Sequence, residues 1–218
     1  MVVHVCKQNC WLQVLLSKLR EKSTSRSDFR YFSNLLGEYL LIQAINEGFI
    51  PTIPIPEIYT PTGSVVDGGV ALAGPESIMA VSIVRAGNAF FDACLRIISP
   101  EIQMGQLVIQ RDEETALPKT SLEKLPSNIQ HAKCVIVLDP MLATGGSVLA
   151  AIDLLAKRGV KPERIVLIHA LGCPEGIAAV QAKYPTVKVV VGVEDSHLNE
   201  RKFIIPGLGD FGDRFYAN

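Results

Sequence analysis

Residues 135–147, VIVLDPMLATGGS, bring together an apolar run, an acid, hydroxyl side chains and adjacent glycines. The β-branched run 135–138 predicts a buried parallel strand, and residues 147–158 have the apolar spacing of a helix that Gly159 ends. The loop between them has little side-chain bulk, so its amide N–H groups can converge at the helix N-terminus and bind phosphate. Asp139 lies at the carboxyl end of the strand, where its carboxylate can accept sugar hydroxyls. The segment therefore predicts a site for a sugar phosphate.

This loop differs from the two commonest phosphate-binding loops. No Lys follows its glycines, as a Walker loop requires, and the Gly-x-Gly-x-x-Gly spacing of dinucleotide-binding proteins is absent. The phosphate prediction depends instead on the strand–loop–helix pattern together with Asp139, Thr144 and Ser147.

Two arginines each follow a run with the pattern of a buried strand. Arg85 enters a turn of small residues, where a guanidinium is costly unless it meets an anion or forms a surface salt bridge. Arg111 opens the charged stretch 111–115, and from that stretch alone we expect a solvated hairpin tip. We interpret three of its residues as solvent-exposed loop residues: Asp112, Glu113 and Glu114.

Residues 204–211, IIPGLGDF, are too short and Gly-rich for a regular element, yet too apolar for a plain surface turn. Glycines let backbone N–H and C=O groups approach a ligand closely. The segment is therefore a candidate ligand-binding loop, with a structural C-terminal turn as the alternative.

The elements that must position these residues alternate in the order of an α/β protein. Apolar runs predict parallel strands at 78–84, 106–110, 134–138, 164–170 and 187–193. Helical spacing marks residues 27–47, which Ser27 or Asp28 can cap, and residues 89–98, 147–158 and 176–183. These helices supply the crossovers of a doubly wound, five-stranded parallel sheet. Residues 48–77, rich in proline and glycine, predict irregular or short antiparallel structure.

Length and composition fit a single domain spanning residues 1–218. The chain is 48% apolar and 20% charged, with a net charge of −1 and no Lys/Arg cluster, which argues against nucleic acid or an anionic membrane as partner. No apolar run approaches membrane-spanning length and no signal-peptide pattern begins the chain, so we expect a cytoplasmic protein. Cys94, Cys134 and His169 are interpreted as core residues, the histidine with its hydrogen bonds satisfied, and His197 as a surface residue.

The phosphate loop resembles the signature of type I phosphoribosyltransferases, in the form found in uracil phosphoribosyltransferases. Pro140, in place of a second acid, is typical of the uracil enzymes. Further matches stand in the family's order: 27–30 (SDFR), 84–87 (VRAG), 111–115 (RDEET), 206–210 (PGLGD) and 212–214 (GDR). Two departures stand beside them, since Asn88-Ala89-Phe90 replaces the usual Leu-Gly-Met and Phe211 replaces a small residue.

The resemblance implies the type I fold, with residues 1–77 and 195–218 forming a hood and N-terminal arm over the strand ends. It also implies transfer of phosphoribosyl from 5-phospho-α-D-ribose 1-diphosphate to uracil. Arg85 and Arg111 would contact the leaving diphosphate, Arg111 from the base of a mobile loop. Phosphoribosyl diphosphate would be held by Asp139, Pro140, Met141, Leu142, Ala143, Thr144, Gly145, Gly146 and Ser147. The backbone would read uracil at Ile204, Gly209, Asp210 and Phe211.

Several roles stay open within the resemblance. Asp210 could orient a Mg²⁺-bound water or assist loss of the N1 proton, and Mg²⁺ would be held mainly by the diphosphate because no carboxylate cage appears. The family predicts a homodimer or homotetramer, and GTP binding in some members. The alternatives are a non-catalytic or regulatory homologue, and an enzyme for a purine or orotate, which Pro140 and the C-terminal loop disfavour.

Overall fold

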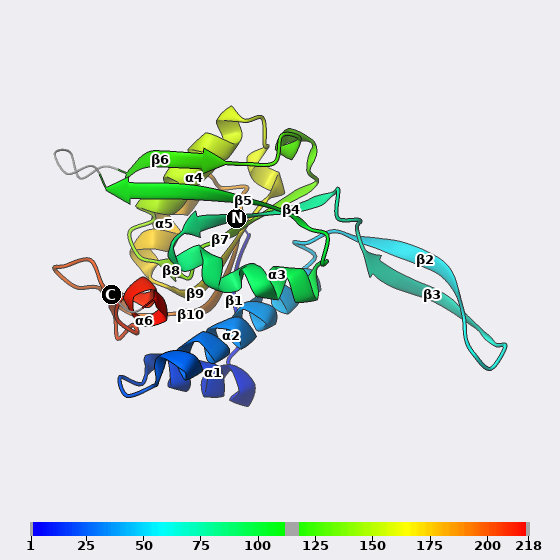
Figure 1. The fold of residues 1–218 in the computed structure, drawn as a ribbon, viewed down its shortest axis with the longest axis horizontal. Coiled ribbons are helices and arrows are strands. Elements are labelled where there is room, and N and C mark those ends of the chain that lie inside the picture. Colours follow the sequence, from blue (N-terminus) through cyan, green and yellow to red (C-terminus); the bar gives the residue numbers. More distant parts are fainter. Residues whose placement is uncertain (1, 112–117, 217–218) are drawn as a thin grey trace.

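The computed structural model describes residues 2–111 and 118–216. Its main sheet has eight strands, and seven of them lie in the order β1-β10-β9-β7-β4-β5-β6 (Figure 1). In chain order these are β1 (Val2–Val5), β4 (Ile78–Val84), β5 (Gln103–Arg111), β6 (Pro118–Lys124), β7 (Cys134–Leu138), β9 (Ile165–Gly172) and β10 (Lys188–Glu194), and β8 (Met141–Leu142) pairs with β9. All pairs are parallel except β5 with β6. The five predicted parallel strands are therefore confirmed.

Helices cover both faces of this sheet because its strands are apolar on both sides. One face packs against α1 (Cys10–Arg20), α2 (Arg26–Asn46) and α3 (Phe91–Ile97), which follows the short helix η1 (Ala86–Phe90). The other packs against α4 (Gly146–Lys157) and α5 (Pro174–Lys183). Within β7, Ile136 faces the first layer, whereas Val135 and Val137 face the second. Two further short helices are η2 (Ile129–His131) and η3 (Pro162–Arg164).

The strand order places a topological switch point between β4 and β7. From β4 the chain passes to β5 on one side, and it later returns to β7 on the other side of β4. In open α/β sheets, ligands bind at the carboxyl edge beside such a point. Because β4, β5 and β7 are parallel, their carboxyl ends lie side by side along this edge.

Residues 48–77 differ from the expected hood segment. They form a regular antiparallel hairpin of β2 (Thr52–Tyr59) and β3 (Val65–Leu72), which projects from the body of the molecule (Figure 1). The hairpin leads directly into the amino end of β4, so it lies away from the carboxyl edge. Pro54 and Pro56 fit within β2 because a two-stranded ribbon leaves one side of each strand without backbone partners.

The C-terminal segment packs against the ends of the N-terminal helices. It contains the paired strands β11 (His197–Leu198) and β12 (Ile204–Ile205) and the helix α6 (Phe211–Tyr216). The ring centroid of Phe211 lies 5.1 Å from that of Phe29 in α2. We call residues 195–216 and the adjoining ends of α1 and α2 the hood.

The helix α1 was not predicted, and α2 begins at a cap other than the two expected. Asn9 caps α1 by accepting the Leu12 N–H at 2.9 Å, and α2 begins after Ser25, whose hydroxyl accepts the Asp28 N–H at 3.1 Å. Neither Ser27 nor Asp28 is the cap, because the helix already includes both residues. None of the helices in residues 2–111 and 118–216 is long and apolar enough to cross a membrane.

Candidate active site

The predicted phosphate loop surrounds a cavity at the N-terminus of α4. The cavity has a volume of about 120 Å³ and is lined by Asp139 and residues 141–148. Gly145 precedes the helix with φ +79°, a conformation that favours glycine. The first amides of a helix have no intrahelical acceptor, so those of α4 are available to an anion in this cavity. The helix begins one residue earlier than predicted, at Gly146.

The far side of this loop is fixed by its contacts with β9 and α5. The Pro140 carbonyl accepts the N–H groups of Ala170 and Leu171 at 2.8 and 3.1 Å. A Cβ atom on Gly176 would lie only 2.3 Å from the Ala143 carbonyl oxygen, so this close approach requires glycine. The loop is thus held from behind by contacts within the protein.

Asp139 lies at the edge of the cavity. Burial raises the pKa of its carboxyl group to about 7, although a hydrogen bond from the Met141 N–H lowers the pKa in part. The Nδ1 of His169 lies 2.5 Å from the Asp139 carbonyl oxygen and must donate, because a carbonyl can only accept. Burial lowers the pKa of His169 to about 4, so the ring is neutral. The core position of His169 is confirmed, but its Nε2 has no hydrogen-bond partner among the described residues.

Arg85 leaves β4 next to the end of β7. A Cβ atom on Gly87 would lie 2.1 Å from the Leu138 carbonyl oxygen, so glycine allows this turn to pack against the residue before Asp139. The Arg85 guanidinium lies 3.6 Å from the Asp213 carboxylate, and both side chains are about half exposed. Such an exposed pair is weak, so a more highly charged anion could displace Asp213.

The departures at residues 88–90 are accommodated by the fold. Asn88 accepts hydrogen bonds through Oδ1 from Ser82 Oγ at 2.5 Å and from Gln106 Nε2 at 3.3 Å. Ala89 and Phe90 are buried in the core beneath α2. The altered turn is therefore tied to β4 and β5 and still presents Arg85.

Arg111 is the last residue of β5, which runs beside β4, and its backbone pairs with Pro118. Its position at the carboxyl edge agrees with the prediction. The predicted loop residues Asp112, Glu113 and Glu114 lie outside the described residues.

The candidate base loop, residues 204–211, connects β12 to α6. Gly207 and Gly209 have φ angles of +61° and +85°, so the turn needs glycine at both positions. Asp210 caps α6 by accepting the Asp213 N–H through Oδ1 at 2.9 Å. The Phe211 ring is 2% exposed and packs among aromatic rings of α2, η1 and α6, so its bulk is absorbed by the hood core.

The C-terminal helix connects this loop to the Arg85 turn. Asp213 contacts the Arg85 guanidinium, and the Tyr216 hydroxyl donates to the Arg85 carbonyl oxygen at 2.9 Å. Of the predicted side chains that the structure describes, Arg85, Asp139 and Asp210 thus belong to segments that adjoin at the carboxyl edge. His197 is exposed, as predicted.

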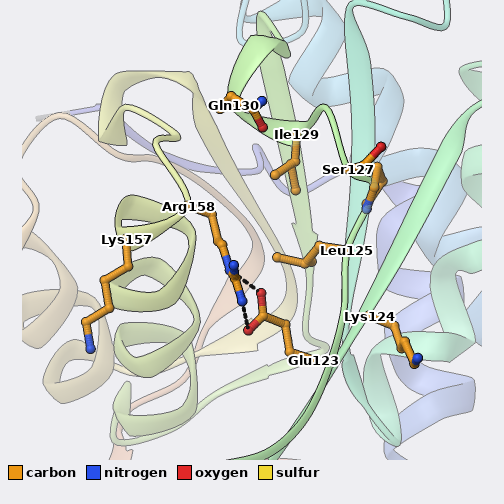
Figure 2. Close-up of a pocket in the computed structure, with 9 residues that line it drawn as sticks. Glu123, Lys124, Leu125, Ser127, Ile129, Gln130, Lys157 and Arg158 are labelled. Carbon is orange, nitrogen blue, oxygen red and sulfur yellow. Dashed lines mark hydrogen bonds and ion pairs between the residues drawn. The ribbon is translucent and has the colours of Figure 1, made fainter.

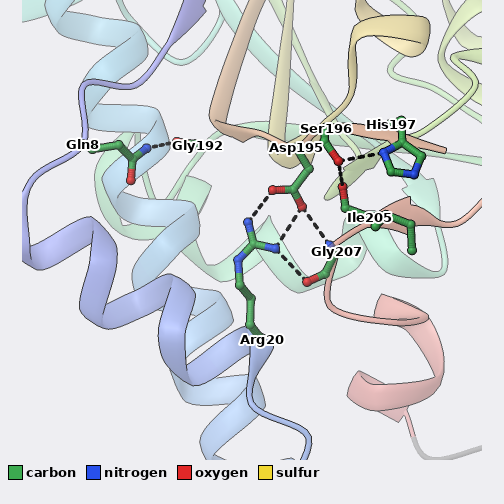
Figure 3. Close-up of polar contacts among 8 residues, drawn as sticks. All are labelled: Gln8, Arg20, Gly192, Asp195, Ser196, His197, Ile205 and Gly207. Atoms are coloured by element: carbon green, nitrogen blue, oxygen red, sulfur yellow. Dashed lines mark hydrogen bonds and ion pairs between the residues drawn. The ribbon is translucent and has the colours of Figure 1, made fainter. Parts of the chain in front are cut away.

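Sequence reasoning missed an ion pair beside the base loop. Arg20, at the end of α1, binds Asp195, which follows β10, and both contact Gly207 (Figure 3). Asp195 lies two residues beyond the predicted strand 187–193, and an acid near the end of a parallel strand was the available signal for it. Arg20 carried no comparable signal, because its partner lies 175 positions away in the chain.

A mostly parallel sheet, with a cavity at a helix N-terminus after one central strand, a turn containing Arg85 after the neighbouring strand and a C-terminal hood, defines a type I phosphoribosyltransferase, as predicted. Residues 5–218 match the sequence profile of uracil phosphoribosyltransferase, and the chain belongs to that family.

Individual relatives agree with this assignment over nearly the whole chain. A uracil phosphoribosyltransferase of Dictyostelium discoideum is 48% identical over 217 residues, covering 99% of this chain and 96% of the relative. The Saccharomyces cerevisiae uracil phosphoribosyltransferase is 42% identical, with the same two coverages. Among solved structures, the AQ2163 protein from Aquifex aeolicus has a TM-score of 0.81 at 30% identity, covering 99% of this chain and 98% of that one.

Proposed function

We propose that this protein converts uracil and 5-phospho-α-D-ribose 1-diphosphate to UMP and diphosphate, as in pyrimidine salvage. The observation that carries the proposal is the cavity of about 120 Å³ at the N-terminus of α4, with Asp139 at its edge. This cavity suits the 5′-phosphate, because helix amides and small residues surround it. Its neighbours at the carboxyl edge are Arg85 on one side and the Gly-rich loop of the hood on the other.

In the proposed reaction, uracil N1 displaces diphosphate from C1′ with inversion, and no covalent enzyme nucleophile is needed. Catalysis then depends on positioning the reactants and on stabilising the charge that develops on the leaving group. Residues 143–147 hold the 5′-phosphate and Asp139 accepts the ribose hydroxyls. Arg85 and Arg111 bind the diphosphate, for which the Arg85 guanidinium gives up its weak contact with Asp213.

Uracil is read by the backbone of the loop in this proposal. O2, N3–H and O4 alternate as acceptor, donor and acceptor, a pattern that the N–H and C=O groups of Ile204, Gly209, Asp210 and Phe211 can match. The loop supports this role because Gly209 is exposed and has a φ angle of +85°, so no side chain of its own covers the backbone there. A purine or orotate is disfavoured because the loop and Pro140 follow the uracil form.

The residues present fit a Mg²⁺ ion that is bound mainly through the diphosphate. The described residues contain no cluster of three His, Cys, Asp or Glu side chains able to hold a metal by themselves. Bound to the diphosphate, Mg²⁺ would neutralise charge on the leaving group. Asp210 uses Oδ1 to cap α6, so its Oδ2 is the atom that can orient a metal-bound water or receive the N1 proton.

A diphosphate-release assay with several bases tests the proposal. The expected result is UMP and diphosphate from uracil, and no product from hypoxanthine or orotate. Turnover of a purine or orotate at a comparable rate would contradict it. If no base reacts while phosphoribosyl diphosphate still binds, the protein is the regulatory homologue.

We further propose a homo-oligomer, either a dimer or a tetramer. The projecting hairpin supports it, because an isolated two-stranded ribbon is marginally stable and this one exposes Ile53, Ile58, Tyr59, Val65, Val66 and Val70. Light scattering at several concentrations tests it. A cytoplasmic location and GTP binding stay predictions, the first from composition and the second from family resemblance alone.

A further inference from the structure

Asp195 is a buried carboxylate at the carboxyl edge that the proposed reaction does not use. It is 6% exposed, and its backbone N–H donates to the Gly172 carbonyl at the end of β9, at 2.8 Å. Arg20 binds both of its carboxylate oxygens, with Nη2 donating to Oδ1 at 2.6 Å and Nη1 to Oδ2 at 2.9 Å (Figure 3). A buried charge requires such a partner, and here the pair also contacts a third residue.

That third residue is Gly207, in the base loop, and the pair holds both of its backbone polar groups. The Gly207 N–H donates to Asp195 Oδ2 at 2.9 Å, and the Gly207 carbonyl accepts from Arg20 Nη1 at 2.7 Å. A Cβ atom on Gly207 would lie 2.1 Å from the Ile204 carbonyl oxygen. The peptide groups on both sides of Gly207 are therefore fixed in position.

Arg214 adds a second attachment of the loop to the end of α1. Its Nη1 donates to the Leu208 carbonyl at 2.9 Å and also to the carbonyl of Leu19, and its Nη2 donates to the Glu21 carbonyl at 2.6 Å. The loop thus lies between the end of α1 and the edge of the sheet. Asp195 is the member of this network that follows a strand of the main sheet directly.

We propose that Arg20 and Asp195 are positioning residues for base recognition. They do not touch the base; they act through Gly207, which fixes the backbone of the loop in the geometry that reads uracil. Recognition through backbone groups needs placement within roughly 0.5 Å, which glycines with positive φ do not ensure by themselves. The inference rests on the proposed function, and it assigns to Arg20 and Asp195 the role of setting the affinity of the protein for uracil.

Asp195→Asn is the main test, because it keeps the side-chain shape and removes the charge. We expect the KM for uracil to rise about 10- to 100-fold, while the KM for phosphoribosyl diphosphate changes less than about threefold. Arg20→Ala should match this effect. Arg20→Lys, which keeps the charge but not the bidentate geometry, should fall between it and the wild type.

Arg158→Ala is the matched control. Arg158 forms a bidentate pair with Glu123, at 2.6 and 2.9 Å, in a cavity of about 530 Å³ between the end of α4 and β6 (Figure 2). This pair lies at the end of α4 opposite to the phosphate loop. Its loss should leave both KM values unchanged.

Amide hydrogen exchange without substrates separates the positioning role from the proposed function. Peptides covering residues 203–211 should exchange faster in Asp195→Asn than in the wild type or in Arg158→Ala. If the wild type turns over no base, the proposed function fails while this comparison still tests the attachment of the loop. Unchanged exchange in this segment, or equal rises in both KM values, would overturn the proposal. If Asp195→Asn does not fold, the same comparisons apply to Arg20→Lys.

Discussion

Asp139→Asn should stabilise the protein at high pH while impairing its activity. The pKa of Asp139 is raised from 3.8 to about 7 because burial disfavours its charged form. A carboxyl group whose pKa is higher in the folded state favours folding at low pH. This contribution is fully present below the unfolded-state pKa and is lost as the pH rises through about 7. At pH 8 the ionised side chain therefore opposes folding.

The size of the effect follows from the shift. A difference of about three pKa units corresponds to about 4 kcal/mol at pH 8, an upper limit because Asp139 keeps some exposed surface. At pH 5 the same linkage predicts that Asp139 destabilises the folded state by only about 1.6 kcal/mol. The advantage of Asp139→Asn over the wild type should thus grow by about 2.5 kcal/mol between pH 5 and pH 8 and level off above pH 7.

Denaturant unfolding of both proteins at several pH values measures this difference. His169 contributes equally to both proteins and cancels. Asp153→Asn is the control of opposite sign: desolvation raises the pKa of Asp153, but hydrogen bonds from Lys183 and Tyr184 together with the charges of Lys183 and Lys157 outweigh it and lower the pKa. An Asp139→Asn protein that is no more stable than the wild type at pH 8, or whose stability difference from the wild type does not vary with pH, would refute the reasoning.

UMP affinity should fall in the same variant, since an amide accepts ribose hydroxyls less well than a carboxylate.

Three further outcomes test the site. Replacing Arg85 or Arg111 with Ala should lower kcat/KM by about 100-fold or more with little change in thermal stability, and near-normal rates in both variants would remove them from the site. Gly87→Ala should destabilise the protein by about 1–3 kcal/mol and slow turnover, because the new Cβ overlaps the Leu138 carbonyl; normal stability in thermal unfolding would contradict the tight packing of that turn. Cytosine, which has an amino group in place of O4 and an acceptor at N3, should react at least about 100-fold more slowly than uracil, and comparable rates in a diphosphate-release assay would reject backbone reading by the loop.

The central sheet and the strand–loop–helix arrangement around Asp139 could be predicted from sequence because their signals are local. A strand buried on both faces is a short apolar run whatever its neighbours are, and β4 and β7 have the predicted bounds. The strand–loop–helix pattern around Asp139 likewise lies within a few residues. The resemblance to a known family then supplied the roles of these residues, which the pattern alone left open.

The missed features depend on contacts between distant parts of the chain. β1 is a short strand at the edge of the sheet, and its pairing with β10 places Val2 opposite Lys188, a residue far away in the chain. Residues 48–77 were expected as irregular or short antiparallel structure, and the second alternative is confirmed, but their prolines and glycines gave no sign that the two strands would be eight residues long. Arg20 and Asp195 are ordinary charged residues in the sequence, and only folding brings them to Gly207.

The C-terminal helix α6 couples the two halves of the proposed site. Asp210 caps the helix next to the base loop, Asp213 contacts the guanidinium of Arg85, and the Tyr216 hydroxyl binds the carbonyl of the same arginine. Six residues therefore set the position of the base loop relative to the diphosphate side. The sugar-phosphate side of the proposed site is held separately by β9 and α5, and the Arg85 turn is held by β4 and β5, so α6 aligns the base loop with segments that the main sheet already fixes. In-line displacement at C1′ requires that the attacking base and the leaving diphosphate keep their relative orientation, and a helix bound to both segments meets that requirement.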